Sequence, residues 1–308
     1  MYPFRKTLLP TLAASIMLVS ACSQDEPRTQ ESPQETPALT WETVQDATHR
    51  VHTVTGFDGP EAVRYNPAQD LYFVSNFTGG GNDRDANGFI SSVSPEGMID
   101  SLQFMTGTDE HPLHAPRGMY IIGTTLWAAD IDGVHGFDTT TGEQTDFVDF
   151  TEFEPGFLND IVAGPDGNLY VTDTGGARFY IIEEGTPSEV MELPFSPNGI
   201  TLDPESQQLI LAPWNEVMEF HAYDIESESL TVFDQARSGG NFDGIEFYQG
   251  RLLSASQIDS SLHVTHDGMD QVIITMPGRP ADIGLDTQRN QVAVPYIARN
   301  EVDIWQLP

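Results

Sequence analysis

The stretch FLNDIVAGPDGNLYVTDTGG, residues 157–176, contains two short apolar runs, IVA and LYV, on either side of a Gly-Pro-Asp-Gly turn. Short apolar runs separated by turn residues are typical of neighbouring β-strands. The first run is preceded by Asn159 and Asp160, and both residue types are depleted from strand interiors. They are either ordinary turn residues or side chains whose oxygen atoms are needed where this strand begins.

Five further segments of the chain resemble this one. Most have a polar or charged residue, then a small or acidic one, an apolar one, a turn and a second strand. In chain order the six segments are GPEAVRYNPAQDLYFVSN (59–76), APRGMYIIGTTLWAAD (115–130), LNDIVAGPDGNLYVTD (158–173), PNGITLDPESQQLILAPW (197–214), FDGIEFYQGRLLSAS (242–256) and PADIGLDTQRNQVAVPY (280–296).

The first of these positions, called here the anchor, recurs at regular intervals. The six anchors are Glu61, Arg117, Asn159, Asn198, Asp243 and Ala281. Neighbouring anchors are 56, 42, 39, 45 and 38 residues apart, and further apolar runs such as RFYIIEE follow each pair of strands. Such periods, with about four short strands each, indicate a β-propeller. We predict an all-β fold, a six-bladed β-propeller with four-stranded blades over residues 41–308. Residues 41–54 should close the last blade, which leaves no exposed sheet edge.

The N-terminal region has the features of a secretory signal. Residues 1–22 contain two basic residues, an apolar stretch and small residues ending in Cys22, the only cysteine of the chain. The tetrapeptide Val-Ser-Ala-Cys at 19–22 resembles a bacterial lipobox, which implies acylation of Cys22 and a lipid anchor in the cell envelope. Ser23 after the cysteine resembles lipoproteins sent to the outer membrane. A plain signal peptide with an unrelated cysteine is the alternative. Residues 23–40 are rich in Pro, Gln and Glu and should form a disordered tether.

The chain is strongly acidic. Its 308 residues carry a formal net charge of −34, and no lysine follows Lys6. Such a surface repels nucleic acid and anionic headgroups, so we expect no nucleic-acid partner and membrane contact only through the anchor. Dense carboxylates without lysine suggest adaptation to salty surroundings, where ions screen the self-repulsion, although simple acidic drift would give the same composition.

The predicted propeller brings the anchors together, because the innermost strand of each blade runs along the central channel. Two carboxylates and two amide oxygens would then converge, which is unfavourable unless a cation joins them. All four donors are hard oxygens, so one divalent cation is expected, calcium first, with magnesium, manganese or zinc as alternatives. The competing interpretation is a water-filled channel in which Asn and Asp merely form turns.

The repeats resemble the family of senescence-marker protein, gluconolactonase and luciferin-regenerating enzyme, which are six-bladed propellers. The motifs that carry the likeness are PEAV, LNDIVAGPDGNLYVTD, PNGITLDP and FDGIEF, and it covers roughly residues 55–308. The resemblance implies that Glu61, Asn198 and Asp243 bind one divalent cation and that Asn159 binds metal or substrate. It also implies that Asp243 deprotonates the attacking water in the hydrolysis of a lactone or related ester.

One anchor departs from that pattern, since Arg117 would compete with a cation in the ring. It should either bind a substrate carboxyl, phosphate or oxyanion, or form a structural ion pair with Asp160 or Asp130. His111 and His114 precede it and either line the mouth of the channel, where His114 would contact substrate, or lie in an exposed loop.

A second candidate site lies in NDRDANGFIS, residues 82–91. Asp83, Asp85 and Asn87, followed by a glycine, match the start of an EF-hand calcium loop. The bidentate glutamate at the twelfth position is missing, because Ser94 stands there. An Asx-rich turn is therefore the alternative to a second calcium loop.

Two functions of different classes follow from the sequence. The first is a monomeric, metal-dependent hydrolase of small lactones or esters. The second is a non-catalytic binding propeller, similar to NHL repeat arrays, whose metal only stabilises the centre. No Gly-x-Ser-x-Gly motif is present, which argues against a serine hydrolase. The fold alone cannot separate these functions, because propellers serve both.

Overall fold

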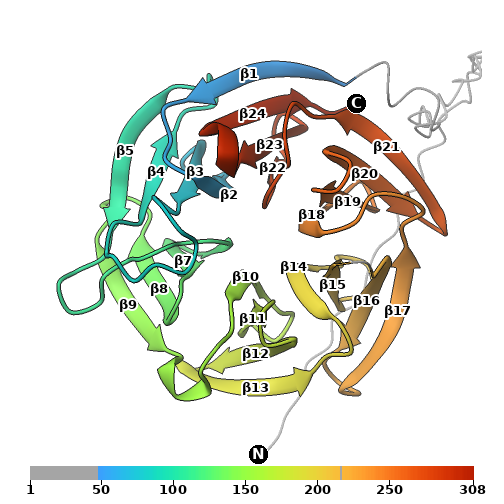
Figure 1. Ribbon diagram of the computed structural model, residues 1–308, viewed down its shortest axis with the longest axis horizontal. Helices are drawn as coiled ribbons and strands as arrows, with labels where there is room; N and C mark the ends of the chain where they lie inside the picture. The colour runs from blue at the N-terminus through green and yellow to red at the C-terminus, as the bar shows by residue number, and fades with distance from the viewer. Residues whose placement is uncertain (1–47, 216) are drawn as a thin grey trace, which may run out of the picture. The chain divides into compact units, whose positions relative to one another are not determined.

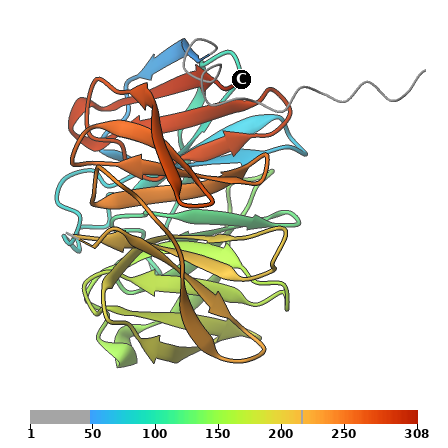
Figure 2. The ribbon, with the colours of Figure 1, turned by 90° about the vertical axis from the view of Figure 1, so that its right-hand side faces the viewer.

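The computed structural model describes residues 48–215 and 217–308, so Cys22, the signal and the tether predicted for 1–40 lie outside the described residues. Within the described ranges the chain forms six four-stranded antiparallel sheets arranged around a central channel (Figure 1). Figure 2 shows the same ring from the side, with the blades one after another around it. The predicted all-β, six-bladed propeller with four-stranded blades is confirmed.

The blades are numbered here from the first anchor. Blade 1 contains β2 (Pro60–Asn66), β3 (Leu71–Asn76), β4 (Phe89–Val93) and β5 (Ile99–Thr106); blade 2 contains β6 (Met119–Ile122), β7 (Thr125–Ala129), β8 (Gly133–Asp138) and β9 (Gln144–Asp149); blade 3 contains β10 (Leu158–Ala163), β11 (Leu169–Asp173), β12 (Arg178–Glu183) and β13 (Thr186–Glu192). Blade 4 contains β14 (Ser196–Leu202), β15 (Leu209–Trp214), β16 (Glu219–Asp224) and β17 (Ser229–Gln235); blade 5 contains β18 (Phe242–Tyr248), β19 (Arg251–Ser256), β20 (Ser261–His266) and β21 (Met269–Thr275); blade 6 contains β22 (Gly284–Asp286), β23 (Gln291–Tyr296), β24 (Glu301–Gln306) and β1 (His49–Thr55). There are also two short 3-10 turns in the described residues. The turn η1 (Thr151–Phe153) follows blade 2, and η2 (Ile297–Arg299) follows strand β23.

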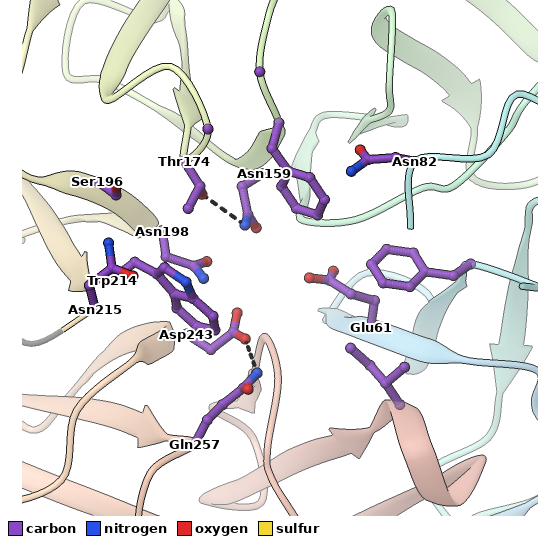
Figure 3. A pocket seen from close by; sticks show the side chains of 15 residues that line it. Glu61, Asn82, Asn159, Thr174, Ser196, Asn198, Trp214, Asn215, Asp243 and Gln257 are labelled. Atoms are coloured by element: carbon purple, nitrogen blue, oxygen red, sulfur yellow. Dashed lines mark hydrogen bonds between the residues drawn. The ribbon is translucent and has the colours of Figure 1, made fainter. Parts of the chain in front are cut away.

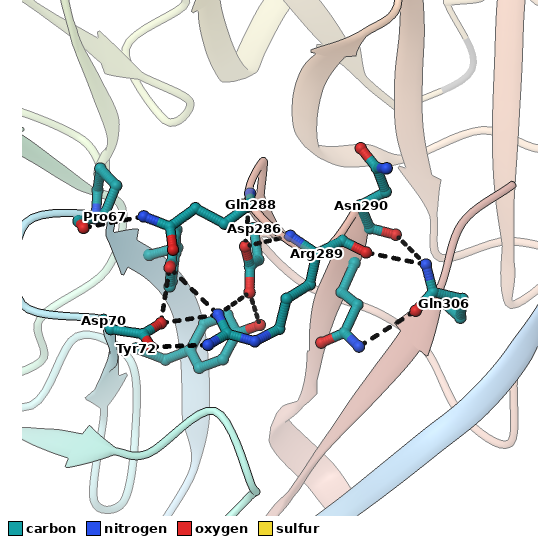
Figure 4. A network of polar contacts seen from close by, with 10 residues as sticks. Pro67, Asp70, Tyr72, Asp286, Gln288, Arg289, Asn290 and Gln306 are labelled. Carbon is teal, nitrogen blue, oxygen red and sulfur yellow. Dashed lines mark hydrogen bonds and ion pairs between the residues drawn. The ribbon is translucent and has the colours of Figure 1, made fainter.

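The ring closes by strand pairing between the two ends of the propeller. Strand β1 pairs antiparallel with β24, so the N-terminal strand completes the last blade as the sequence indicated. Blades 1 and 6 are also joined by side chains (Figure 4). Arg289 donates to both carboxylate oxygens of Asp70, at 2.7 and 2.6 Å, and to Asp286 at 2.9 Å. Tyr72 donates to the same Asp286 at 3.0 Å, so one buried carboxylate connects both blades.

Apolar side chains fill the spaces between neighbouring sheets. One cluster combines Ala129 and Val134 of blade 2 with Ile161, Val171 and Tyr180 of blade 3. Alternate residues of each strand face such a cluster, which is why the sequence shows short apolar runs bounded by turns. Over residues 48–215 and 217–308, no helix is long and apolar enough to cross a membrane.

The inner strands of four blades share a β-bulge at the anchor. In β10 two residues, Asn159 and Asp160, lie opposite the single residue Thr172 of β11. The register shifts in the same way between Pro60 and Val63, between Pro197 and Ile200, and between Phe242 and Ile245. A bulge interrupts the pairing and redirects a side chain, so the repeated bulge places each anchor at the channel.

The residue after each anchor contacts the next blade, which explains why it is small or acidic. A β-carbon on Gly118 would lie 2.3 Å from the Asp160 carboxylate, and one on Gly199 would lie 2.3 Å from the carbonyl oxygen of Asp243. Asp160 itself accepts hydrogen bonds from the backbone N–H of Ile161 at 2.7 Å and of Ile200 at 2.8 Å. Asn159 and Asp160 therefore differ in role, because Asn159 is the anchor of its blade, whereas Asp160 joins blades 3 and 4.

Candidate metal centre

Four anchors converge on one cavity at one end of the channel (Figure 3). Glu61, Asn159, Asn198 and Asp243 come from β2, β10, β14 and β18, and each is at most 4% exposed. Their side chains point toward a common centre in the close-up view, and all four line a cavity of about 650 Å³. The structure thus brings together all four residues that the sequence nominated as metal ligands.

Each of these four side chains has a buried oxygen atom without a hydrogen-bond partner. The atoms are Glu61 Oε2, Asn159 Oδ1, Asn198 Oδ1 and Asp243 Oδ1. Buried polar atoms are nearly always hydrogen-bonded, and leaving one unpaired costs about 1–3 kcal/mol. Four such oxygens around one point, with two of them from carboxylates, match the ligand preference of a hard divalent cation. The residues present therefore fit a metal ion of the calcium type.

Two neighbouring side chains determine which oxygens face the centre. The amide nitrogen of Asn159 donates to Thr174 Oγ1 at 3.0 Å, which turns Oδ1 toward the other anchors. Gln257 donates to Asp243 Oδ2 at 2.7 Å and leaves Oδ1 directed at the centre. Thr174 as acceptor and Gln257 as donor both fix the orientation of a ligand, as the partners of metal ligands commonly do.

Thr174 and Gln257 were not identified from the sequence, although a signal exists. Each directly follows the second strand of its blade. The residues at this position in five blades line the cavity, namely Phe77, Thr174, Asn215, Gln257 and Ile297. The position varies in residue type, so only its place in the repeat could have marked it.

Burial is the main cause that raises the pKa of both acidic anchors. Burial, and then the nearby Asp243 carboxylate, raise the pKa of Glu61 well above its usual range, although Arg117 opposes the shift. Burial raises the pKa of Asp243 to about 7, against the hydrogen bond from Gln257. A cation bound between them would favour the ionised forms, so metal binding should release protons.

Arg117 lies beside the cavity, next to Asn82, Phe77 and Phe157 of its wall. Its side chain is fully buried and is not part of the cavity wall. The guanidinium donates to the carbonyl oxygens of Leu158, at 3.0 Å, and Gly81. It also lies 3.7 Å from the centre of the Phe157 ring, and among the described residues no ion pair joins it to Asp130 or Asp160. Burial lowers the pKa of Arg117 to about 10, although the field of Glu61 acts in the opposite direction.

The two histidines before Arg117 lie away from the cavity. His114 is buried, and its Nδ1 accepts a hydrogen bond from the backbone N–H of Ala86 at 3.0 Å. The ring of His111 stacks on Phe147, with 4.4 Å between the ring centres. Neither side chain lines the cavity, so His114 does not lie where the predicted contact with a substrate would require it.

The segment that resembles an EF-hand forms an exposed loop. Asp83, Asp85 and Asn87 are all exposed. The Asn87 amide donates to Asp85 Oδ2 at 2.8 Å, and Asn87 Oδ1 accepts the hydroxyl of Thr78. Both contacts join side chains, so the second calcium loop and the Asx-rich turn stay alternative predictions for this loop. The preceding residue, Asn82, lies on the cavity wall, so the loop forms part of the rim.

A further group of metal-ligand types, Asp130, Asp132 and His135, lies in blade 2 and was not expected. Asp130 accepts hydrogen bonds at 2.7 Å from the backbone N–H groups of His114 and Ala115. These bonds hold the loop that leads to Arg117, and this role accounts for the buried carboxylate.

Hydrogen bonding also assigns the proton of His135 to the nitrogen that faces the carboxylate. Gln144 Oε1 accepts from the backbone N–H of Thr108 at 3.0 Å, so its amide nitrogen donates to His135 Nδ1 at 2.9 Å. The proton of the neutral ring is then on Nε2, 3.5 Å from Asp130 Oδ2. A protonated Nε2 does not ligate a metal, so this group fits a cation less well than the anchors do.

Asp173 has the same task in blade 3 as Asp130 in blade 2. Its carboxylate accepts the backbone N–H groups of Gly156 at 3.0 Å and Phe157 at 2.7 Å. Both of these residues line the cavity. The final aspartate of the stretch 157–176 therefore positions the cavity wall beside the Asn159 anchor.

Comparisons with known proteins agree with this architecture. No protein family model matches the chain, and no curated protein matches it. A presumed gluconolactonase superposes with a TM-score of 0.66 at 18% sequence identity, covering 84% of this chain and 91% of the other. A gluconolactonase from Xanthomonas campestris gives a TM-score of 0.64 at 16% identity over the same shares, 84% and 91%. Gluconolactonases are therefore among the structural neighbours of this chain.

A different activity occurs among the neighbours as well. A virginiamycin B lyase from Staphylococcus aureus, studied with quinupristin, gives a TM-score of 0.59 at 14% identity over 85% of this chain and 99% of its own. That protein is a catalytically inactive variant in which alanine replaces a histidine. At such identities the likeness establishes the fold alone, so the chemistry must be argued from the site.

Proposed function

We propose that the protein is a divalent-metal-dependent hydrolase of lactones or related esters, with the metal in the central channel. The observation that carries this proposal is the convergence of four buried, unpartnered oxygen atoms from Glu61, Asn159, Asn198 and Asp243. The gluconolactonase-like neighbours support the reaction class.

The four anchors would hold the cation, and calcium is the ion that the donor set favours. All four donors are oxygens, and neither a thiol nor an imidazole lines the described cavity wall. Glu61 and Asp243 together neutralise the two positive charges. When bound, such an ion polarises an ester or lactone carbonyl as a Lewis acid and stabilises the oxyanion of the transition state.

Asp243 is the residue proposed to act as general base. Burial raises its pKa to about 7 before a cation binds, and a general base is most effective with a pKa near the working pH. Gln257 holds Oδ2 in place and leaves it a lone pair for the proton of the attacking water. Asn198 and Glu61 act as fixed ligands, while Asn159 orients either the cation or the substrate oxygen.

The composition of the cavity favours hydrolysis over a lyase reaction. In the neighbouring lyase, a variant without one histidine is inactive. Within the described residues, no histidine lines the cavity of this chain. The only ionisable groups of that wall are the carboxyls of Glu61 and Asp243, which suit activation of water.

We also propose that the chain is secreted and anchored by acylated Cys22 to the cell envelope, with the outer membrane as the expected location. The supporting observation is the lipobox-like segment ending at residue 22. Fractionation tests this, because Cys22→Ser should release the protein from membranes. If the variant sediments with membranes as the wild type does, the anchor is wrong.

Metal analysis followed by hydrolysis assays tests the proposed activity. We expect about one divalent ion per chain, and lactone or ester hydrolysis that chelator abolishes and added ion restores. If the ion stays bound and no lactone or ester in a broad panel is hydrolysed, the non-catalytic binding propeller is the better description.

A further inference from the structure

The cavity beside the anchors contains no accessible cation among the described residues. Its charged side chains are Glu61 and Asp243, both assigned above to the metal, and the whole chain carries −34. With a cation bound, its two positive charges are already matched by Glu61 and Asp243, so a carboxylate or phosphate on the substrate would add a negative charge that no basic side chain of the wall pairs. Placing an unpaired charge in such a site is strongly unfavourable.

The nearest candidate for a basic partner is Arg117, and it is not available. All of its described contacts are internal: it donates to the carbonyl oxygens of Leu158 and Gly81 and lies 3.4 Å from Asn82 Oδ1. Its guanidinium also packs 3.7 Å from the ring centre of Phe157 and 5.5 Å from that of Phe77. Both rings line the cavity while the guanidinium does not, so a ligand meets aromatic carbon there instead of positive charge.

The apolar part of the wall is large for so polar a centre. Phe77, Phe157, Trp214 and Ile297 line the cavity, and Trp214 lies across it from Glu61 (Figure 3). Aromatic side chains on two sides favour a flat or hydrocarbon substituent.

The neutral polar groups of the wall are largely used within the protein. Thr174 accepts the Asn159 amide and Gln257 donates to Asp243. Ser196, Asn215 and the amide nitrogen of Asn82, whose Oδ1 accepts from Arg117, remain to contact a ligand. A polyhydroxylated lactone would bury more hydroxyl groups than these three side chains can satisfy, and each unpaired hydroxyl lowers affinity.

We infer that the substrate is an uncharged lactone or ester that bears an aromatic or alkyl substituent, bound between Trp214 and the Phe77–Phe157 wall. This inference rests on the proposed function for the bond that is cleaved, but it concerns a different part of the cavity. A volume of about 650 Å³ is adequate for a small lactone with one ring as substituent.

Three substrates test the inference with purified protein and its cation. They are γ-phenyl-γ-butyrolactone, the same lactone with a para-carboxylate on its ring, and glucono-1,5-lactone. The neutral phenyl lactone should have the highest kcat/KM, by about 10²-fold, the scale on which pockets discriminate by apolar contact or by unpaired polar groups. Equal or greater kcat/KM for the carboxylated or the sugar lactone would overturn the inference.

Two variants assign the effect to the wall. Trp214→Ala should lower kcat/KM for the phenyl lactone by about 10-fold or more and leave the value for glucono-1,5-lactone nearly unchanged. Val232→Thr, on the exposed face of β17, is the control and should alter neither. A loss of the same size for both lactones in Trp214→Ala would show a general structural defect and contradict a substituent pocket.

Binding separates this inference from the proposed hydrolysis. The lactam 5-phenyl-2-pyrrolidinone has the same shape as the phenyl lactone and resists hydrolysis, so its affinity can be measured by calorimetry without turnover. If no ester is hydrolysed, yet the lactam binds at least 10-fold more tightly than its para-carboxylate and loses affinity in Trp214→Ala, the pocket is correct and the hydrolase proposal is wrong. If neither form of the lactam binds, the inference fails whatever the enzyme hydrolyses.

Discussion

Replacing Asn198 by leucine should change thermal stability with opposite signs in chelator and in calcium. Among the described residues, no protein group donates a hydrogen bond to the buried Oδ1 of Asn198. Removing an unsatisfied buried polar atom relieves a cost of about 1–3 kcal/mol, so Asn198→Leu should be neutral or stabilising in chelator. In calcium the same change removes a ligand, and the stabilisation that the ion gives the folded state should fall.

The magnitude in calcium follows from linkage. At a free concentration 100 times its Kd, an ion that binds only the folded state raises the free energy of unfolding by about 2.7 kcal/mol. For a domain of this size, 1 kcal/mol corresponds to about 2–4 °C in Tm. Wild type should therefore gain about 5–11 °C on going from chelator to calcium, and the variant should gain much less. Differential scanning calorimetry over a calcium series measures both.

A matched control uses an asparagine with satisfied hydrogen bonds on the same inner strand as Glu61. The amide of buried Asn66 donates to Gln69 at 2.8 Å and accepts from the backbone N–H of Ala68 at 3.0 Å. Asn66→Leu should lower Tm equally in chelator and in calcium. If Asn198→Leu behaves like this control, or if no divalent ion raises the Tm of wild type, the anchors do not bind a cation.

Three further predictions concern the same centre. Asp243→Asn should lower the rate of hydrolysis by about 10²–10⁴-fold, while its metal occupancy falls less. Glu61→Gln should instead weaken metal binding first and regain activity in excess ion. Metal analysis and kinetics test both variants, and full metal occupancy with full rate in both would refute the assigned roles. The folded-state pKa of Asp243 is raised to about 7, so the metal-free protein binds more protons when folded than when unfolded. Its free energy of unfolding should therefore fall as the pH rises from about 4 to 7, and its calcium affinity should rise over the same range. Urea titrations and calorimetry measure these two slopes, and slopes of the opposite sign would contradict the prediction. Gly199→Ala should reduce both stability and metal affinity, because its β-carbon would lie 2.3 Å from the Asp243 carbonyl oxygen. Calorimetry measures both, and an unchanged Tm would show that the two strands can separate without cost.

The six-bladed ring could be predicted because its determinants are local and repeated. Short apolar runs, turn residues and a fixed position for each anchor recur at intervals of 38 to 56 residues. Each repeat forms one sheet that buries its faces against its neighbours, so a regular period determines the architecture. The convergence of Glu61, Asn159, Asn198 and Asp243 follows from the same regularity, since each occupies the same bulge of its inner strand.

The orientation of individual side chains was decided only by the tertiary structure. Arg117 occupies an anchor position, but carbonyl groups of Gly81 and Leu158 and the ring of Phe157 hold it outside the cavity. Those partners come from a long loop of blade 1 and from blade 3, so nothing in the repeat around Arg117 specifies them.

The partners of the ligands are set in the same way. Gln257 and Thr174 occupy a position whose residue type varies from blade to blade, and their contacts with Asp243 and Asn159 exist only when the loops are folded over the channel. The sequence by itself determined which backbone positions reach the centre, because strand period and turn chemistry act over a few residues. Which atoms face a ligand there depends on contacts between segments tens of residues apart, and only the closed ring brings those segments together.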